Sequence, residues 1–217
     1  MKTVADDIVV IGAGGFGRET LDVIEAVNAD AGAPRWRVLG VVDDAPAATH
    51  LERLAARGYR HLGGVDAAER VLSTAFVVVA IGAPAVRARV AAHLEATGAT
   101  SATLVHPRAV LGSEVTVGVG SVVCAGVQVS TNVRLGRRVH LNPGAIVGHD
   151  TVLEDDVSVN PGAVLSGEVR VSERTLVGAG AVVLQGLRVG ADAVIGAAAC
   201  VTRDVSDGVV VKGVPAR

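Results

Sequence analysis

The chain has 217 residues, of which 50% are apolar and 2% aromatic, and its formal net charge is -2. It has no run of lysine and arginine, which argues against a nucleic acid as the main partner. Only Cys124 and Cys200 are present, so we expect neither a disulfide framework nor a cysteine-based metal site, and a reducing, cytoplasmic setting is favoured. The acidic start and the absence of a long apolar run predict neither a signal peptide nor membrane insertion.

The first third of the chain opens with an apolar run and a glycine-rich turn. We expect a buried parallel strand at Ile8–Ile11, a turn at Gly12–Gly17 and a helix over residues 18–26. A GxGxxG motif binds phosphate in this context, because glycines let the backbone approach the ligand and the helix N-terminus offers free N–H groups. The candidate contacts within the turn are Gly14, Gly15 and Phe16.

Two further strands would complete a small α/β domain. A strand at Val38–Val42 ends in Asp43 and Asp44, whose carboxylates could accept hydrogen bonds from a ribose or a base edge. Another at Phe76–Ile81 ends at Gly82, a further candidate contact, and a helix follows over residues 85–94. The small size of this domain favours a mononucleotide or a nucleotide-sugar over NAD. The alternative is a structural turn that binds nothing.

The rest of the chain is built on a period of six. Every sixth residue from Val105 to Val201 is Val, Leu or Ile, which fits a short strand followed by a corner. Three such units would close a triangular coil, and that longer period is visible where Asn142–Ala145 recurs as Asn160–Ala163. A glycine column at 126, 144, 162 and 180 suggests a corner with unusual φ. We therefore predict a left-handed parallel β-helix of hexapeptide repeats over residues 105–217, after a Rossmann-like domain over 1–104.

The flat aliphatic faces of such a coil favour packing against copies of itself. Three prisms around one axis form a closed assembly, so we expect a homotrimer with long, narrow clefts between its subunits.

Among the histidines, His149 is the candidate general base. It lies in a Gly-His-Asp triplet at an expected corner, where its side chain could project into a cleft between subunits. Imidazole titrates near neutral pH and could take the proton of an attacking amine or hydroxyl in acyl transfer, while Asp150 could hold its tautomer. His149 could instead be only an exposed corner residue, or His140 could be the base; His106 is expected to be structural. No metal-ligand spacing and no nucleophile motif occurs.

Several segments, in this order and spacing, resemble the bacterial sialic-acid O-acetyltransferase and nucleotide-amino-sugar N-acetyltransferase family of hexapeptide-repeat proteins. The segments are VVIGAGGFGRE, VVDD, AIGAPAVR, LVHPRAVLG, LNPGAIVGHD and VVVKGVPAR, and together they extend over essentially the whole chain. The resemblance implies a nucleotide-sugar-binding domain over 1–104 and an acyltransferase domain with a C-terminal tail over 105–217. It also implies a trimer with acetyl-CoA lying along the β-helix between subunits.

The resemblance further assigns roles to single residues. His149 would be the general base, and Asp150 would increase its basicity. The nucleotide part of the acceptor would be held by Gly14, Gly15, Phe16, Asp43 and Asp44. Acetyl-CoA would contact Ser158, Gly167, Ala179, Gly196 and Ala197.

Two positions depart from some nucleotide-sugar N-acetyltransferases of this group. Phe16 and Ser158 stand where those enzymes carry histidines, which bears on the identity of the acceptor and removes one expected acetyl-CoA contact. The leading prediction is N-acetylation of a nucleotide-linked amino sugar. The alternatives are O-acetylation of sialic acid or another sugar hydroxyl, an amino-acid acetyltransferase of the serine type, and a non-catalytic scaffold that binds a nucleotide or a sugar.

Overall fold

Short β-branched runs in the N-terminal part form a parallel sheet in the order β2-β1-β3-β4. The computed structural model describes residues 5–217. The strands of this sheet are β1 (Asp6–Ile11), β2 (Trp36–Val42), β3 (Phe76–Val79) and β4 (Thr100–Ser101). The helices are α1 (Gly15–Asp30), α2 (Ala48–Ala56), α3 (Val65–Leu72) and α4 (Pro84–Ala96).

Successive side chains of β1 enter two different cores, as expected for a strand buried on both faces. Ile8 and Val10 pack in the cluster that includes side chains of α1 and of the first coils, whereas Val9 and Ile11 pack with α3 and α4. The chain leaves β1 for β2 on one side and later returns to β3 on the other. Ligands of α/β sheets bind at such a switch point, beyond the carboxyl ends of the strands.

The predicted elements are present with shifted ends. Helix α1 begins at Gly15, inside the predicted turn, because the glycine turn leads directly into the first helical residues. Strand β3 ends at Val79, two residues before the predicted end. There the carbonyl oxygen of Ile81 accepts a hydrogen bond from the guanidinium of Arg87 at 2.8 Å.

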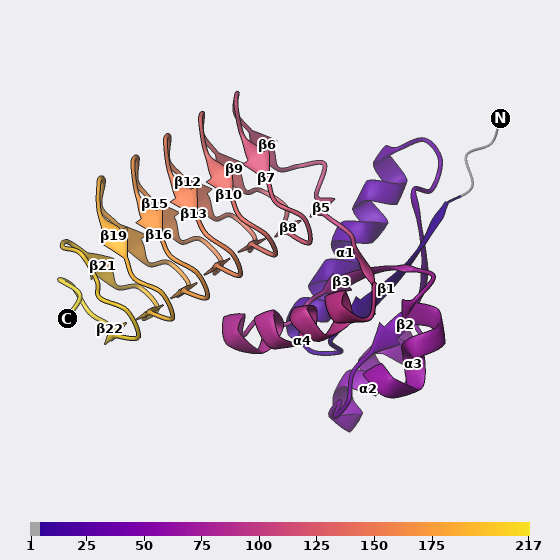
Figure 1. Ribbon diagram of the computed structural model, residues 1–217. Helices are drawn as coiled ribbons and strands as arrows, with labels where there is room; N and C mark the ends of the chain where they lie inside the picture. Colours follow the sequence, from indigo (N-terminus) through magenta and orange to yellow (C-terminus); the bar gives the residue numbers. More distant parts are fainter. Residues whose placement is uncertain (1–4) are drawn as a thin grey trace.

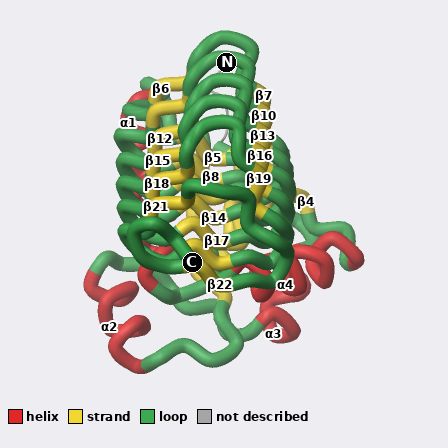
Figure 2. The backbone as a smooth tube through the Cα atoms, turned by 90° about the vertical axis from the view of Figure 1, so that its left-hand side faces the viewer, coloured by secondary structure: helices red, strands yellow, loops and turns green. Residues whose placement is uncertain are grey.

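The hexapeptide repeats form three parallel sheets that enclose one core, and Figure 2 shows the strands of each sheet stacked in a column. The first sheet contains β5 (Leu104–Val105), β8 (Val122–Val123), β11 (His140–Leu141), β14 (Ser158–Val159), β17 (Leu176–Val177), β20 (Val194–Ile195) and β22 (Val210–Val211). The second contains β6 (Val110–Leu111), β9 (Gln128–Val129), β12 (Ile146–Val147), β15 (Val164–Leu165), β18 (Val182–Val183) and β21 (Cys200–Val201). The third contains β7 (Thr116–Val117), β10 (Arg134–Leu135), β13 (Val152–Leu153), β16 (Arg170–Val171) and β19 (Arg188–Val189).

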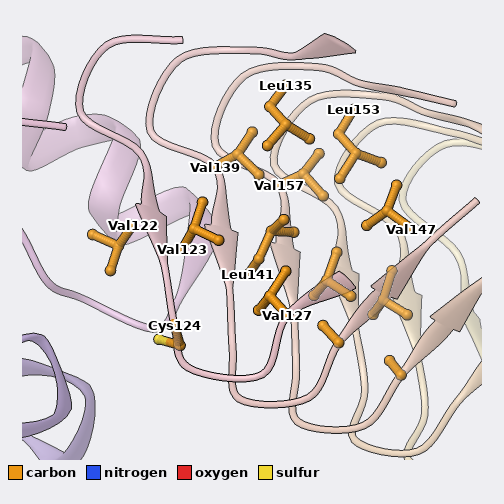
Figure 3. Close-up of a cluster of buried hydrophobic side chains, with 14 of the residues drawn as sticks. Val122, Val123, Cys124, Val127, Leu135, Val139, Leu141, Val147, Leu153 and Val157 are labelled. Atoms are coloured by element: carbon orange, nitrogen blue, oxygen red, sulfur yellow. The ribbon is translucent and has the colours of Figure 1, made fainter. Parts of the chain in front are cut away.

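From Val123 to Val201 the aliphatic residue of every hexad is buried, and Figure 3 shows Leu141, Val147 and Leu153 pointing into the interior. Every sixth residue from Glu114 to Ala198 has a positive φ, which turns the chain at each corner. The four glycines of the predicted column have φ between 64° and 71°, so the unusual corner conformation is confirmed. The structure thus confirms the predicted fold, a Rossmann-like domain followed by a left-handed parallel β-helix.

The two parts pack closely, as Figure 1 shows for α1 and α4 beside the first coils. Helix α1 packs against β5, and one hydrophobic cluster runs without a break from α1 into the β-helix. Helix α4 lies farther along the stack, where Arg87 pairs with Asp156. At the far end β22 joins the first sheet, and the N–H of Ala216 donates to the carbonyl of Cys200 at 2.7 Å. Within residues 5–217 no helix has the length and apolarity needed to span a bilayer.

Candidate active site

The Gly-His-Asp triplet forms the corner that follows β12. The side chain of His149 is 54% exposed there, and its Nδ1 lies 2.7 Å from Oδ2 of Asp150. An ionised carboxylate only accepts hydrogen bonds, so the proton of a neutral imidazole is held on Nδ1 and Nε2 keeps its lone pair. Asp150 is one of the corner residues with positive φ, at 59°. The arrangement presents a nitrogen that can accept a proton from a bound nucleophile.

Asn132 supports this pair from the previous coil. Its Nδ2 donates to Oδ1 of Asp150 at 3.1 Å, so both carboxylate oxygens are occupied. The hydrogen bonds from His149 and Asn132 hold the pKa of Asp150 below its usual range. Sequence reasoning did not single out Asn132, although the coil period of 18 residues places it directly beside Asp150.

Gly167 lies one coil beyond His149 and leaves room for the imidazole. A methyl group on Gly167 would lie 2.5 Å from Cε1 of His149, and closer still to Nε2. The ring therefore lies over the glycine Cα. The family resemblance assigned Gly167 to acetyl-CoA binding, and the structure brings it next to the proposed base.

A cavity lies at the carboxyl ends of β1, β2 and β3, apart from the corner of His149. It has a volume of about 360 Å³, and its lining includes five of the predicted acceptor contacts, namely Gly14, Gly15, Phe16, Asp43 and Gly82. Asp44 lines the adjacent cavity, which shares Gly12, Asp43 and Ile81 with the first. The structure thus brings all six predicted acceptor residues to one edge of the sheet.

The two acids of this edge already have backbone partners. Asp43 accepts from the N–H groups of Ala13 and Ala45, at 2.8 and 3.0 Å, which ties the glycine turn to the end of β2. Asp44 accepts from the N–H of Val65 at 2.8 Å, at the first residue of α3. Each carboxylate can accept further hydrogen bonds, so these contacts shape the site and still leave acceptor capacity for a ligand.

His140, the alternative base, is only 1% exposed. Burial and the charge of Arg87 hold the pKa of His140 well below 6.5, so its ring is neutral at physiological pH. Its ring packs on Phe16 with a centroid distance of 4.4 Å, and Arg87 is itself fully buried. Sequence reasoning did not single out Arg87, because nothing local marks an arginine of α4 as a contact of β11.

Four of the predicted cofactor residues lie at the two corners that border the second sheet of the β-helix, and the fifth, Ser158, lies in the first sheet. Ala179, Gly196 and Ala197 lie at the corner before the second sheet of the β-helix, and Gly167 lies at the corner after it. A groove of about 450 Å³ lies on the outer face of this sheet, with Val110, Ile146 and Gly148 in its lining. Ser158 is separate: it is buried on β14 in the first sheet, where its hydroxyl donates to the carbonyl of Gly82 at 3.2 Å. Within residues 5–217 no cluster of His, Cys, Asp and Glu is arranged to hold a metal ion.

Comparison with known proteins gives this geometry a context. Residues 7–94 match the family described as the PglD N-terminal domain. A GDP-perosamine N-acetyltransferase of Escherichia coli O157:H7 is 32% identical over 150 residues, which are 69% of this chain. The match spans about 65% of the length of that curated relative.

Solved structures align over almost the full length. PerB from Caulobacter crescentus, in complex with CoA and GDP-perosamine, is 31% identical with a TM-score of 0.86, covering 99% of this chain and 97% of PerB. The chain belongs to the family of hexapeptide-repeat sugar acetyltransferases. Within this family, the acetyltransferase domain of PglB from Neisseria gonorrhoeae, in complex with acetyl coenzyme A, is 30% identical with a TM-score of 0.80 and covers 99% of both chains. The family predicted from the sequence is thereby confirmed.

Proposed function

We propose that this sugar acetyltransferase transfers the acetyl group of acetyl-CoA to the amino group of a nucleotide-linked amino sugar. The observation that carries the proposal is the pair of His149 and Asp150, which presents a free imidazole Nε2 at an exposed corner of the β-helix. The names of the relatives support the substrates, because PerB binds CoA and GDP-perosamine and the PglB domain binds acetyl coenzyme A.

The reaction needs one base. As the sugar amine attacks the thioester carbonyl, a nitrogen–carbon bond forms and Nε2 of His149 takes a proton from the nitrogen. The tetrahedral intermediate then collapses, the carbon–sulfur bond breaks, and the same proton passes to the leaving thiolate. Asp150 holds Nδ1–H throughout and stabilises the imidazolium, and Asn132 holds Asp150 in place.

The acceptor's nucleotide part is proposed to lie at the glycine turn. Gly14 and Gly15 have open space where a Cβ would lie, and they lead into the N-terminus of α1, a favourable position for a diphosphate. Asp43 and Asp44 then face the ribose or the base. The cavity lined by Phe16 and Gly82 receives the group nearest the switch point.

Acetyl-CoA is proposed to lie along the second sheet of the β-helix, between the corner of Ala179 and Ala197 and the corner of His149 and Gly167. Val110 and Ile146 are 54% and 43% exposed and line the same groove on this face, which suits a partner surface. A homotrimer would cover them and enclose the cofactor. Ser158 stays a predicted cofactor contact. The free thiols of Cys124 and Cys200 are compatible with work in the cytoplasm.

The test measures thiol release from acetyl-CoA with a panel of UDP-, GDP- and dTDP-linked amino sugars. We expect turnover with one nucleotide class, an amide product that resists mild alkali, and an assembly with three times the 21.8 kDa chain mass. His149→Asn should lower kcat about 10²- to 10⁴-fold, while His50→Asn on α2 serves as the matched control. Full activity of His149→Asn would remove the assigned base, and an alkali-labile ester would indicate O-acetylation.

A further inference from the structure

The interface between α4 and the β-helix contains buried polar side chains, and two of them, Arg87 and His140, have no part in the chemistry proposed above. Arg87 has no exposed surface, and His140 and Ser158 are each about 1% exposed. Burying such groups is costly, so their partners indicate what they hold in place.

Arg87 contacts both the α/β domain and the β-helix. One terminal nitrogen of its guanidinium donates to the carbonyl of Ile81 at 2.8 Å and lies 3.2 Å from Nδ1 of His140. The other terminal nitrogen donates to the carbonyl of Asp156. Desolvation lowers the pKa of Arg87 to about 10, so it stays charged at neutral pH. An arginine only donates, so Nδ1 of His140 must accept, and the imidazole proton is on Nε2.

His140 reaches the acceptor cavity through Phe16. The two rings pack with an interplanar angle of 31°, and Phe16 lines the cavity directly. Nε2 of His140 has no hydrogen-bond partner among the described residues. The contacts of the imidazole include Arg87 at Nδ1, the aromatic ring of Phe16 and the nearby backbone of Val79 at the end of β3.

Ser158 contacts a second part of the lining of the same cavity. It is the residue paired with His140 in the next strand of the first sheet, and its hydroxyl donates to the carbonyl of Gly82. One pair of neighbouring β-helix strands, β11 and β14, thus contacts both parts of the cavity lining, the Phe16 turn and the Ile81–Gly82 turn.

We propose that His140 and Arg87 are positioning residues that fix the position of the acceptor cavity relative to the β-helix. They touch neither the acetyl group nor the sugar amine; they fix the two turns that shape the cavity. The role rests on the proposed function, since it assigns the cavity to the acceptor. Loss of the pair should therefore weaken binding of the acceptor much more than binding of acetyl-CoA, which is proposed to lie mainly along the second sheet.

The variants separate this role from general stability. His140→Ala removes both the ring and the acceptor, whereas His140→Asn keeps an acceptor oxygen close to the position of Nδ1. Arg137→Ala is the matched control, because Arg137 makes an ion pair with Glu95 of α4 at 2.6 Å and does not line the cavity. If His140→Ala fails to fold, His140→Asn and Arg87→Lys carry the test.

The kinetic experiment compares the KM for nucleotide-sugar with that for acetyl-CoA. We expect His140→Ala to raise the acceptor KM about 10- to 100-fold, His140→Asn to raise it less, and both to leave the KM for acetyl-CoA within about twofold. Equal effects on both substrates, or an acceptor KM unchanged in His140→Ala and Arg87→Lys, would overturn the positioning role while the proposed function stood.

Hydrogen exchange gives a readout that needs no turnover. In His140→Ala, amides of the turns at Gly14–Phe16 and Ile81–Gly82 should exchange faster than in Arg137→Ala. The two variants are compared under conditions in which their global free energies of unfolding are equal. Unchanged protection of both turns would refute the positioning role. If the amides of both turns exchange faster as expected but no nucleotide-sugar is acetylated, the proposed function is wrong. The role of His140 and Arg87 in fixing the two turns then still stands.

Discussion

Replacing Gly167 by alanine should disable the enzyme by displacing the base and not by unfolding the coil. The added methyl carbon would lie 2.5 Å from Cε1 of His149, whereas non-bonded heavy atoms need about 3.5 Å. The imidazole must therefore retreat by about 1 Å, which also strains its 2.7 Å contact with Asp150. A misplacement of that size costs roughly 10²-fold in rate, or about 2.7 kcal/mol of transition-state stabilisation.

The assay is steady-state thiol release together with thermal unfolding. Gly167 has no positive φ, so alanine fits the backbone and the Tm should change little, while kcat/KM falls about 10²-fold. In a His149→Ala background the same substitution should have almost no further effect, because the displaced ring is gone. Gln185→Ala, one coil farther in the same column and exposed, is the surface control. A Gly167→Ala enzyme with wild-type kcat/KM would refute the reasoning.

Three further predictions concern the support of the site and of the coil. Asn132→Ala removes one of the two donors to Asp150, so its carboxyl pKa should rise towards the ordinary value and kcat should fall about threefold to tenfold with little change in KM; an unchanged kcat would show that His149 alone fixes Asp150. The pKa of His140 is depressed in the folded state, so below about pH 6.5 the unfolded chain binds the extra proton. Urea titrations should then show wild type losing up to about 1.4 kcal/mol per pH unit relative to His140→Asn, and parallel curves would contradict this. Gly144→Val should lower stability by about 1 to 2 kcal/mol in the same measurement, because φ is 71° there, and Gly144→Asn should cost less; equal losses would argue against the corner strain.

The local pattern of the chain was sufficient to predict the β-helix. Each hexad places an aliphatic side chain and, two residues before it, a small or aliphatic side chain inside, and then turns at a corner, so the same short-range rule repeats from Val105 to Val201. The same rule placed His149 at a corner, where a polar side chain must point outwards. The glycine turn and the acids after the second strand were readable for a similar reason, because the carboxyl ends of parallel strands share one edge.

Only the tertiary structure decided how the two parts meet. No periodicity links Arg87 of α4 to His140 and Asp156, which are 53 and 69 residues away, and its buried contacts depend on how the helix docks on the coils. The length of β3 and the environment of Ser158 were missed for the same reason, since both depend on that interface. Short-range rules act on neighbours in sequence or in a regular repeat, whereas a docking contact depends on the packing of whole elements.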